Sequence, residues 1–193
     1  MRRHPPRHFK QRLLGISLIC IPIIAVVFYV QANNHISTII KENRPGYYAV
    51  SHFVDGDTIA VIMQGKEEKV RFIGVDTPET HKPHTPVQCY GPAAAAHTKN
   101  VIGTQRVRLE ADRLSTNRDR YDRLLRYVYL ADGTLLNKAI IQNGYGFYYP
   151  YFPYTKAEEF KAAQELAQAG HRGLWGNCNP IKKGEGYESN VAT

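Results

Sequence analysis

Three short stretches of this 193-residue chain carry side chains that could do chemistry. The first reads VDGDT and holds Asp57, the second reads VRFIGVDTPE and holds Arg71, Asp76 and Glu79, and the third reads DRYDR and ends at Arg123. Carboxylates are ligands for hard cations such as Ca²⁺, and a guanidinium offers a rigid fork to two phosphate oxygens. Because such charges are costly to bury unpaired, their types and spacing predict a divalent cation beside a phosphodiester.

The elements around these stretches should place the charges at strand ends. β-branched and aromatic residues predict a strand up to Val75, and Pro78 disfavours helical geometry at the residue before it, so the chain should turn there. Asp55-Gly56 is a turn signal in the first stretch, and we assign Asp55 only the bonding of its own turn. An apolar strand follows the third stretch, at residues 124–130.

The chain beyond residue 45 reads as three strands, a helix, two strands and two helices. Thr155 and Glu158 have the spacing of a capping box at the start of the last helix, and Gly170 closes it. This order fits an α+β protein built on a five-stranded OB-type β-barrel with about three α-helices, and such barrels bind nucleic acids or sugars. We expect strands at 47–54, 58–63, 69–75, 105–110 and 124–130, and helices at 91–103, 135–143 and 155–169.

The three stretches, in this order and with similar gaps, resemble the staphylococcal nuclease family over residues 47–175. The resemblance implies an OB-type fold and a calcium-dependent nuclease that hydrolyses DNA and RNA with little sequence preference and leaves 3′-phosphates. Glu79 would orient or deprotonate the attacking water, or stand in the outer shell of the metal. The implied ligands of Ca²⁺ are Asp57, Asp76 and the carbonyl of Thr77, and the implied catalytic residues are Arg71, Glu79 and Arg123.

The resemblance also suggests contacts to the substrate. Tyr121 corresponds to a substrate-side tyrosine, and Arg120 is a further candidate for a phosphate contact. A second tyrosine is expected from the loop at residues 145–154, where aromatic rings could stack on bases without sequence preference. The length and character of this loop differ from the family, so three candidates stay open: Tyr148, Tyr149 and Tyr151.

A departure from the family pattern lies in the third stretch. The staphylococcal enzyme has Tyr-Gly-Arg where this chain has Tyr-Asp-Arg at residues 121–123. Asp122 could draw on Arg123 electrostatically, or it could restrict the turn that a glycine would allow. Either effect would bear on the rate of the reaction more than on its type.

The formal net charge of +8 is unevenly spread. Five basic residues precede position 13 and no acidic residue precedes Glu42, which leaves +3 for the rest of the chain. Residues 13–30 are apolar and uncharged, so we expect a membrane-spanning helix with the following domain outside the cytoplasm. A signal-peptidase site at Val30-Gln31-Ala32 would instead release a secreted domain. The expected parts are an anchor or signal peptide (1–32), a linker (33–45), the nuclease domain (46–178) and a disordered tail (179–193).

Two cysteines, Cys89 and Cys178, lie outside the apolar segment. An even pair in an oxidising compartment favours a disulfide between the start of the first helix and the C-terminal tail, with two separate thiols as the alternative. A zinc site at His81, His84 and Cys89 is disfavoured, because no fourth ligand has suitable spacing.

Three hypotheses for function remain, each for a monomer. The first is an exported nuclease that acts on single- or double-stranded DNA and RNA. The second is a catalytically inactive OB-type module that binds nucleic acid at the cell surface, and the third is a surface domain that binds calcium only for stability. Cleavage of single-stranded DNA with calcium and with a chelator separates them.

Overall fold

The structure is a computed structural model that describes residues 25–31, 46–80 and 86–192. The chain divides into two compact units, residues 1–43 and 44–193. Within the described ranges, no helix is both long and apolar enough to cross a bilayer. Only the last part of the predicted membrane-spanning segment 13–30 is described, and the predicted linker 33–45 lies outside the described residues. The anchor and its secreted alternative therefore stay predictions.

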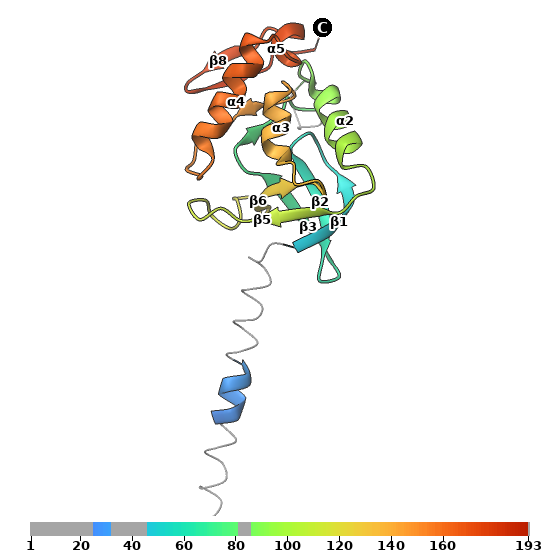
Figure 1. Cartoon of the computed structure of the whole chain (residues 1–193), viewed down its shortest axis with the longest axis vertical. Helices are drawn as coiled ribbons and strands as arrows, with labels where there is room; N and C mark the ends of the chain where they lie inside the picture. The colour runs from blue at the N-terminus through green and yellow to red at the C-terminus, as the bar shows by residue number, and fades with distance from the viewer. Residues whose placement is uncertain (1–24, 32–45, 81–85, 193) are drawn as a thin grey trace, which may run out of the picture. The chain divides into compact units, whose positions relative to one another are not determined.

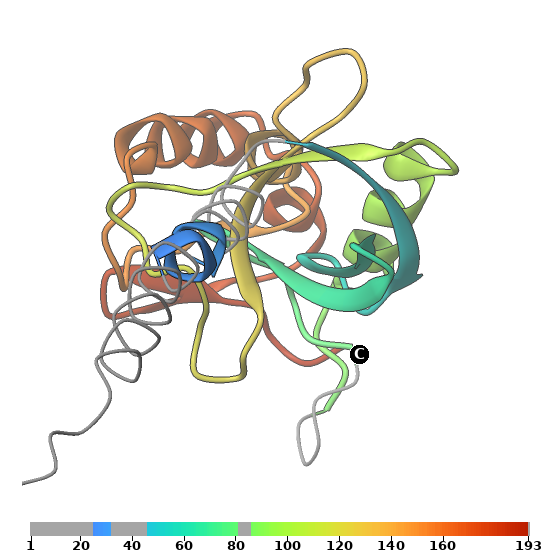
Figure 2. The same cartoon turned by 90° about the horizontal axis from the view of Figure 1, so that it is seen from below.

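Five strands of the second unit close into a barrel, in the order β1-β2-β3-β6-β5 (Figures 1 and 2). All neighbours are antiparallel except β3 and β6, which run parallel. The predicted five-stranded barrel is thus confirmed. Its strands are β1 (Gly46–Phe53), β2 (Thr58–Met63), β3 (Lys66–Phe72), β5 (Val107–Glu110) and β6 (Leu124–Tyr129).

Apolar side chains from β2 and β3 fill the barrel. Ile59, Val61, Val70 and Phe72 are at most 1% exposed and belong to one core cluster. They are spaced two apart because alternate side chains on a strand point to the same face. Burial of each such side chain contributes about 1.5–3 kcal/mol, so the strand ends that carry the polar residues are held on a rigid frame.

Three helices pack around the barrel, with α2 (Gly91–Ile102) and α4 (Ala157–Ala169) on opposite sides in Figure 2 and α3 (Leu136–Gln142) between them in Figure 1. All three lie within a few residues of their predicted bounds, and a short α5 (Leu174–Asn177) was not predicted. The predicted capping box of α4 is wrong, because Lys156 is the N-cap and makes no side-chain capping bond. Thr155 instead donates its N–H (2.8 Å) and its hydroxyl to Asp112, which ties the start of α4 to the loop after β5.

The predicted strand 69–75 is two elements in the structure. β3 ends at Phe72, and Gly74 turns the chain with a φ of +73°. A Cβ at Gly74 would lie 2.6 Å from the ring of Tyr154, so the turn needs glycine for both its conformation and its space. β4 (Val75–Asp76) then leaves the barrel and pairs with β7 (Phe147–Tyr148). This break carries Asp76 away from the barrel wall and into the loop region.

The predicted disordered tail is also wrong for residues 181–188, which form the hairpin β8 (Ile181–Lys183) and β9 (Gly186–Glu188). Tyr187 of this hairpin lies 5.0 Å, centroid to centroid, from the ring of Trp175 and 6.2 Å from that of Phe147. A disulfide joins Cys89 to Cys178, as predicted, with 6.0 Å between the Cα atoms. The hairpin was not predicted because its own sequence is short and charged. The contacts that order it come from aromatic rings distant in the chain.

Candidate active site

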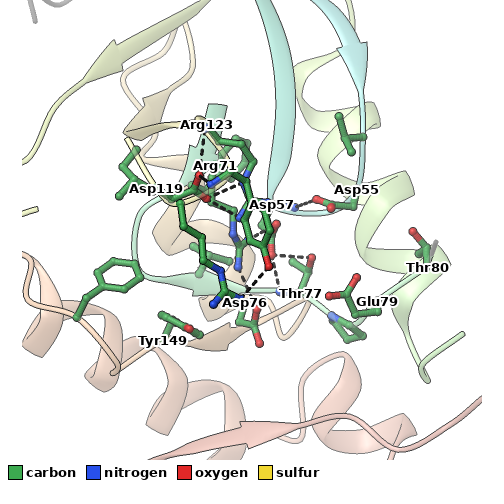
Figure 3. A pocket seen from close by; sticks show the side chains of 18 residues that line it. Asp55, Asp57, Arg71, Asp76, Thr77, Glu79, Thr80, Asp119, Arg123 and Tyr149 are labelled. Atoms are coloured by element: carbon green, nitrogen blue, oxygen red, sulfur yellow. Dashed lines mark hydrogen bonds and ion pairs between the residues drawn. The ribbon is translucent and has the colours of Figure 1, made fainter. Parts of the chain in front are cut away.

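A pocket of about 930 Å³ opens where the turn before β2, the chain around β4 and the loop before β6 meet (Figure 3). Such a volume suits a small ligand or a segment of a larger one. Nine of the predicted site residues line it, and Tyr148 and Tyr151 do not. The nine are Asp57, Arg71, Asp76, Thr77, Glu79, Arg120, Tyr121, Arg123 and Tyr149.

Asp57 is held by hydrogen bonds from Thr77, a residue of the second sequence stretch. It is 4% exposed, and its Oδ2 accepts bonds from the N–H (2.8 Å) and the hydroxyl (3.0 Å) of Thr77. The two turns can approach so closely because Gly56 has no side chain. A Cβ at this position would lie only 2.8 Å from Thr77 Oγ1. Thr98 of α2 donates to the carbonyl of Gly56 (2.6 Å), which fixes the turn from behind. The first two sequence stretches therefore form one structural unit.

Asp55 serves this turn, as predicted. Its Oδ1 accepts the N–H of Asp57 at 3.0 Å, the bond of an Asx turn. Burial raises the pKa of Asp55, and the positive charge of Arg71 opposes that rise. Asp55 also lines the pocket, so its charge belongs to the electrostatics of the site.

Arg71 joins the two predicted metal ligands. The β2–β3 register sets Arg71 opposite Thr58, directly after Asp57 in the chain. Its guanidinium forms an ion pair with Asp57 Oδ1 through Nη1 and a bond of 3.0 Å to Asp76 Oδ1 through Nη2. The carboxylates of Asp57 and Asp76 thus converge on one cationic group, as Figure 3 shows.

Glu79 lies beside Thr77 at the rim of the pocket, nearer to the ion-paired cluster than Thr80 in Figure 3. Pro78 between them is buried and keeps the chain out of helical geometry, as the sequence predicts. The backbone of Glu79 is pinned by Gln88, whose side-chain Oε1 accepts its N–H at 2.8 Å. The glutamate is thereby placed at the edge of the pocket by a residue nine positions later in the chain.

Arg123 is oriented by Asp119, a residue that was not predicted. Asp119 Oδ2 lies 2.7 Å from both Nε and Nη2 of Arg123, and its Oδ1 accepts the N–H groups of Tyr121 (2.9 Å) and Arg123 (3.0 Å). Burial opposes ionisation of Asp119, but the bonds from Arg123 prevail and lower its pKa. The signal was present in the sequence, because an aspartate two residues before a turn is a typical Asx-turn former.

Asp122 does not draw on Arg123. Its side chain is 87% exposed, and its Oδ1 lies 3.6 Å from Nε of Arg118. Its φ of +63° is the left-handed conformation in which the family has glycine, and aspartate tolerates that conformation better than most residues. The turn therefore keeps its shape despite the substitution.

The ring of Tyr121 lies between two arginines at the mouth of the pocket. Arg120 donates to its hydroxyl at 2.8 Å, and the guanidinium carbons of Arg120 and Arg123 lie 4.8 and 5.3 Å from its centroid. Tyr121 is 64% exposed, so its ring is open to a ligand. Guanidinium groups beside an exposed aromatic ring form a surface suited to a phosphate and its adjoining base.

The structure separates the three candidate tyrosines of the later loop. Tyr149 lines the pocket, and its N–H donates to the carbonyl of Gly74 at 3.0 Å. Tyr148 lies in β7, where its N–H donates to Gln164. The hydroxyl of Tyr151 donates to the carbonyl of Lys183 at 2.6 Å. Only Tyr149 is therefore placed to meet a ligand in this pocket.

The charges of the pocket favour a bound cation. Five carboxylates and three guanidinium groups line it, a formal charge of −2, which would repel a phosphodiester unless a cation compensates. Among the described residues, no three His, Cys, Asp or Glu side chains form a metal cluster, so carbonyls and water would have to complete the shell of two carboxylates. This set fits Ca²⁺, which takes 6–8 oxygen ligands that include carbonyls and waters. Zinc is disfavoured further because Cys89 is in a disulfide; His81 and His84 lie outside the described residues.

Comparisons with known proteins point to one family of nucleases. The family model described as "Staphylococcal nuclease homologue" matches residues 69–177. The chain is 39% identical to the thermonuclease of Staphylococcus intermedius over 170 residues, which is 86% of this chain and 98% of that protein. It is 37% identical to the thermonuclease of Staphylococcus hyicus over 85% of this chain and 96% of that protein. It is also 39% identical to the endonuclease YncB of Bacillus subtilis, over 63% of this chain and 58% of that protein.

Proposed function

Because this chain belongs to the staphylococcal nuclease family, we propose that it is an exported, calcium-dependent nuclease. It would hydrolyse phosphodiester bonds of DNA and RNA with little sequence preference and leave 3′-phosphates. The observation that carries the proposal is the convergence of Asp57 and Asp76 on one cationic group, in a pocket that also holds Glu79 and Arg123.

The two arginines suit the charge that develops during hydrolysis. Attack of water on phosphorus builds negative charge on the phosphoryl oxygens, and a guanidinium stays protonated and offers planar donors to them. Asp119 takes two of the five N–H donors of Arg123, which orients the group and leaves donors for a phosphate. Arg71 stands at the floor of the same pocket, beside the two carboxylates.

Glu79 is the candidate for handling the proton of the attacking water. It lines the pocket two residues after Thr77, whose N–H and hydroxyl hold Asp57. A rim carboxylate can accept a proton from water at the phosphorus, which contributes about 10²–10⁴-fold in typical enzymes. This assignment follows from its position and from the matched motif.

Asp57, Asp76 and the carbonyl of Thr77 would hold Ca²⁺. When bound, the ion would supply positive charge to a phosphoryl oxygen and to a pocket that is otherwise negative. The location outside the cytoplasm is supported by the Cys89–Cys178 disulfide, since such bonds persist in oxidising compartments. The membrane-spanning segment at residues 13–30, its cleaved alternative and the monomeric state belong to the same proposal.

The test is cleavage of single-stranded DNA, double-stranded DNA and RNA by the purified chain, with calcium and with a chelator. We expect cleavage of all three only with calcium, and products that become labelled at the 3′ end only after phosphatase treatment. Binding without cleavage would favour the inactive OB-type module. Calcium binding that raises stability with neither cleavage nor nucleic-acid binding would favour the structural surface domain.

A further inference from the structure

The backbone N–H and the backbone carbonyl of Glu79 are both held by Gln88, which lies just before α2. The N–H of Glu79 donates to Gln88 Oε1 at 2.8 Å, and the N–H of Gln88 donates to the carbonyl of Glu79 at 3.0 Å. A Cβ at Gly91 would lie 2.7 Å from that same carbonyl oxygen. Gln88 therefore fixes both polar groups of one residue, and α2 closes on it from one side.

Gln88 in turn is held by the C-terminal segment, residues 186–192. It is 9% exposed and forms an antiparallel bridge with Val191. Its Nε2 lies 3.4 Å from Glu188 Oε1, and the neighbouring Cys89 donates its N–H to the carbonyl of Asn190 at 2.8 Å. The contacts of this segment thus reach Gln88 through both its side chain and its backbone.

Two further bonds and the disulfide reinforce the C-terminal segment. The hydroxyl of Ser189 donates to the carbonyl of Cys89 at 2.8 Å, and Ala192 donates to the carbonyl of Val87 at 2.9 Å. The Cys89–Cys178 bond covalently anchors the residue next to Gln88. Every flank of Gln88 is thereby fixed by residues about 90 to 100 positions away in the sequence.

We propose that Gln88 is a positioning residue for Glu79, and that residues 186–192 together with the disulfide hold Gln88 in place. The inference rests on the proposed catalytic role of Glu79. A displacement of a reacting group by about 1 Å can cost 10²-fold in rate. The two bonds that hold the backbone of Glu79 should therefore affect the rate of cleavage. The end of the chain thus belongs to the active site, although it lies outside the pocket.

The first test compares Gln88→Ala with Gln105→Ala. Gln105 is a matched control, because it also accepts a backbone N–H (Ala131, 3.1 Å) and donates to a carbonyl (Val101, 2.8 Å), but neither of these partners lines the pocket, whereas Glu79 does. We expect Gln88→Ala to lower kcat about 10-fold, the equivalent of one lost hydrogen bond, with KM within about twofold. Gln105→Ala should retain the wild-type kcat at the same temperature, well below the unfolding transition of either variant.

A conservative rescue separates positioning from general packing. The double variant Gln88→Glu/Glu188→Gln keeps an acceptor for the N–H of Glu79 and exchanges the two partners of the side-chain contact. It should recover most of the kcat that Gln88→Ala loses. Equal kcat values for Gln88→Ala and Gln105→Ala would overturn the proposal, as would a double variant no better than Gln88→Ala.

Amide hydrogen exchange keeps the proposal testable apart from catalysis. Exchange at Glu79 should become at least about 10-fold faster in Gln88→Ala and in the double variant Cys89→Ser/Cys178→Ser, since each loosens the same bond. Unchanged exchange in both variants would overturn the proposal even if the wild type is an active nuclease. Conversely, if the two variants show this faster exchange but the wild type cleaves nothing, the proposed function is overturned and only the structural clamp remains.

Discussion

Substitution of Asp119 by asparagine would test how Arg123 is held. Asp119→Asn keeps the shape of the side chain and an oxygen for the N–H groups of Tyr121 and Arg123. It removes the negative charge that meets Nε and Nη2 of Arg123 at 2.7 Å. The turn should therefore survive while the guanidinium loses its orientation.

The contacts allow the size of the effect to be worked out. A hydrogen bond that involves a charged group contributes about 1.5–3 kcal/mol, and asparagine can replace part of the two that Arg123 donates to Asp119. The partial exposure of both side chains, 25% for Arg123 and 17% for Asp119, reduces the value further by solvent screening. A loss of about 1.4–2.8 kcal/mol in transition-state stabilisation remains, which is about 10–100-fold in kcat/KM.

The assay is the initial rate of cleavage of a single-stranded oligonucleotide at saturating calcium. Asp122→Asn is the matched control. It removes an equal charge three residues after Asp119, but the side chain of Asp122 is paired with Arg118 and not with Arg123. We expect the control to retain nearly the full kcat/KM. Equal rates for the two variants would refute the reasoning that Asp119 orients Arg123 for the reaction.

Three further predictions follow from the contacts. Burial opposes ionisation of Asp112, but hydrogen bonds led by Thr155 lower its pKa to about 2, so at neutral pH it should contribute about 1–2 kcal/mol of unfolding free energy after solvent screening. That contribution is fully present above the unfolded pKa of 3.8 and is lost as the pH falls through the folded pKa of about 2. In urea unfolding, Asp112→Asn should therefore be less stable than wild type at pH 7, and the difference should shrink as the pH falls from about 4 towards 2. A difference that stays constant would contradict this. Tyr149→Ala should raise KM about 5–100-fold, the value of one stacked base, whereas Tyr151→Ala should leave KM unchanged; the reverse order would place the substrate elsewhere. Arg71→Gln should lower the unfolding free energy by about 3 kcal/mol without calcium, because it leaves a buried carboxylate unpaired, and calcium should stabilise this variant more than the wild type in the same urea titration.

Much of the site could be predicted from the sequence because its charged residues lie in local motifs. Asp57 and Arg123 directly precede β2 and β6, and Arg71 is the next-to-last residue of β3, so the barrel register fixes where these side chains lie. The pocket then follows from the barrel order. The break at Gly74 was not predicted, although it lies inside one of these motifs. The apolar pattern continues across it, while the chain leaves the barrel and pairs with β7.

The features that were missed depend on contacts between distant segments. Thr155 has the spacing of a helix cap, but Asp112, 43 residues earlier, takes its hydroxyl and N–H. Gln88 looks like an ordinary polar residue until the backbone of Glu79 and the C-terminal segment enclose it. Local propensity cannot report such pairings, because the energy that decides them comes from the tertiary fold.

The most direct test of the central claim is a paired measurement on Glu79→Gln. The claim is that Asp57 and Asp76 gather a divalent cation next to two guanidinium groups, while Glu79 acts on the attacking water. Calorimetry should give a calcium affinity within about threefold of wild type, while cleavage of single-stranded DNA falls by about 10²–10⁴-fold. Cleavage at the wild-type rate by Glu79→Gln, or a wild type that binds calcium and cleaves nothing, would contradict the account.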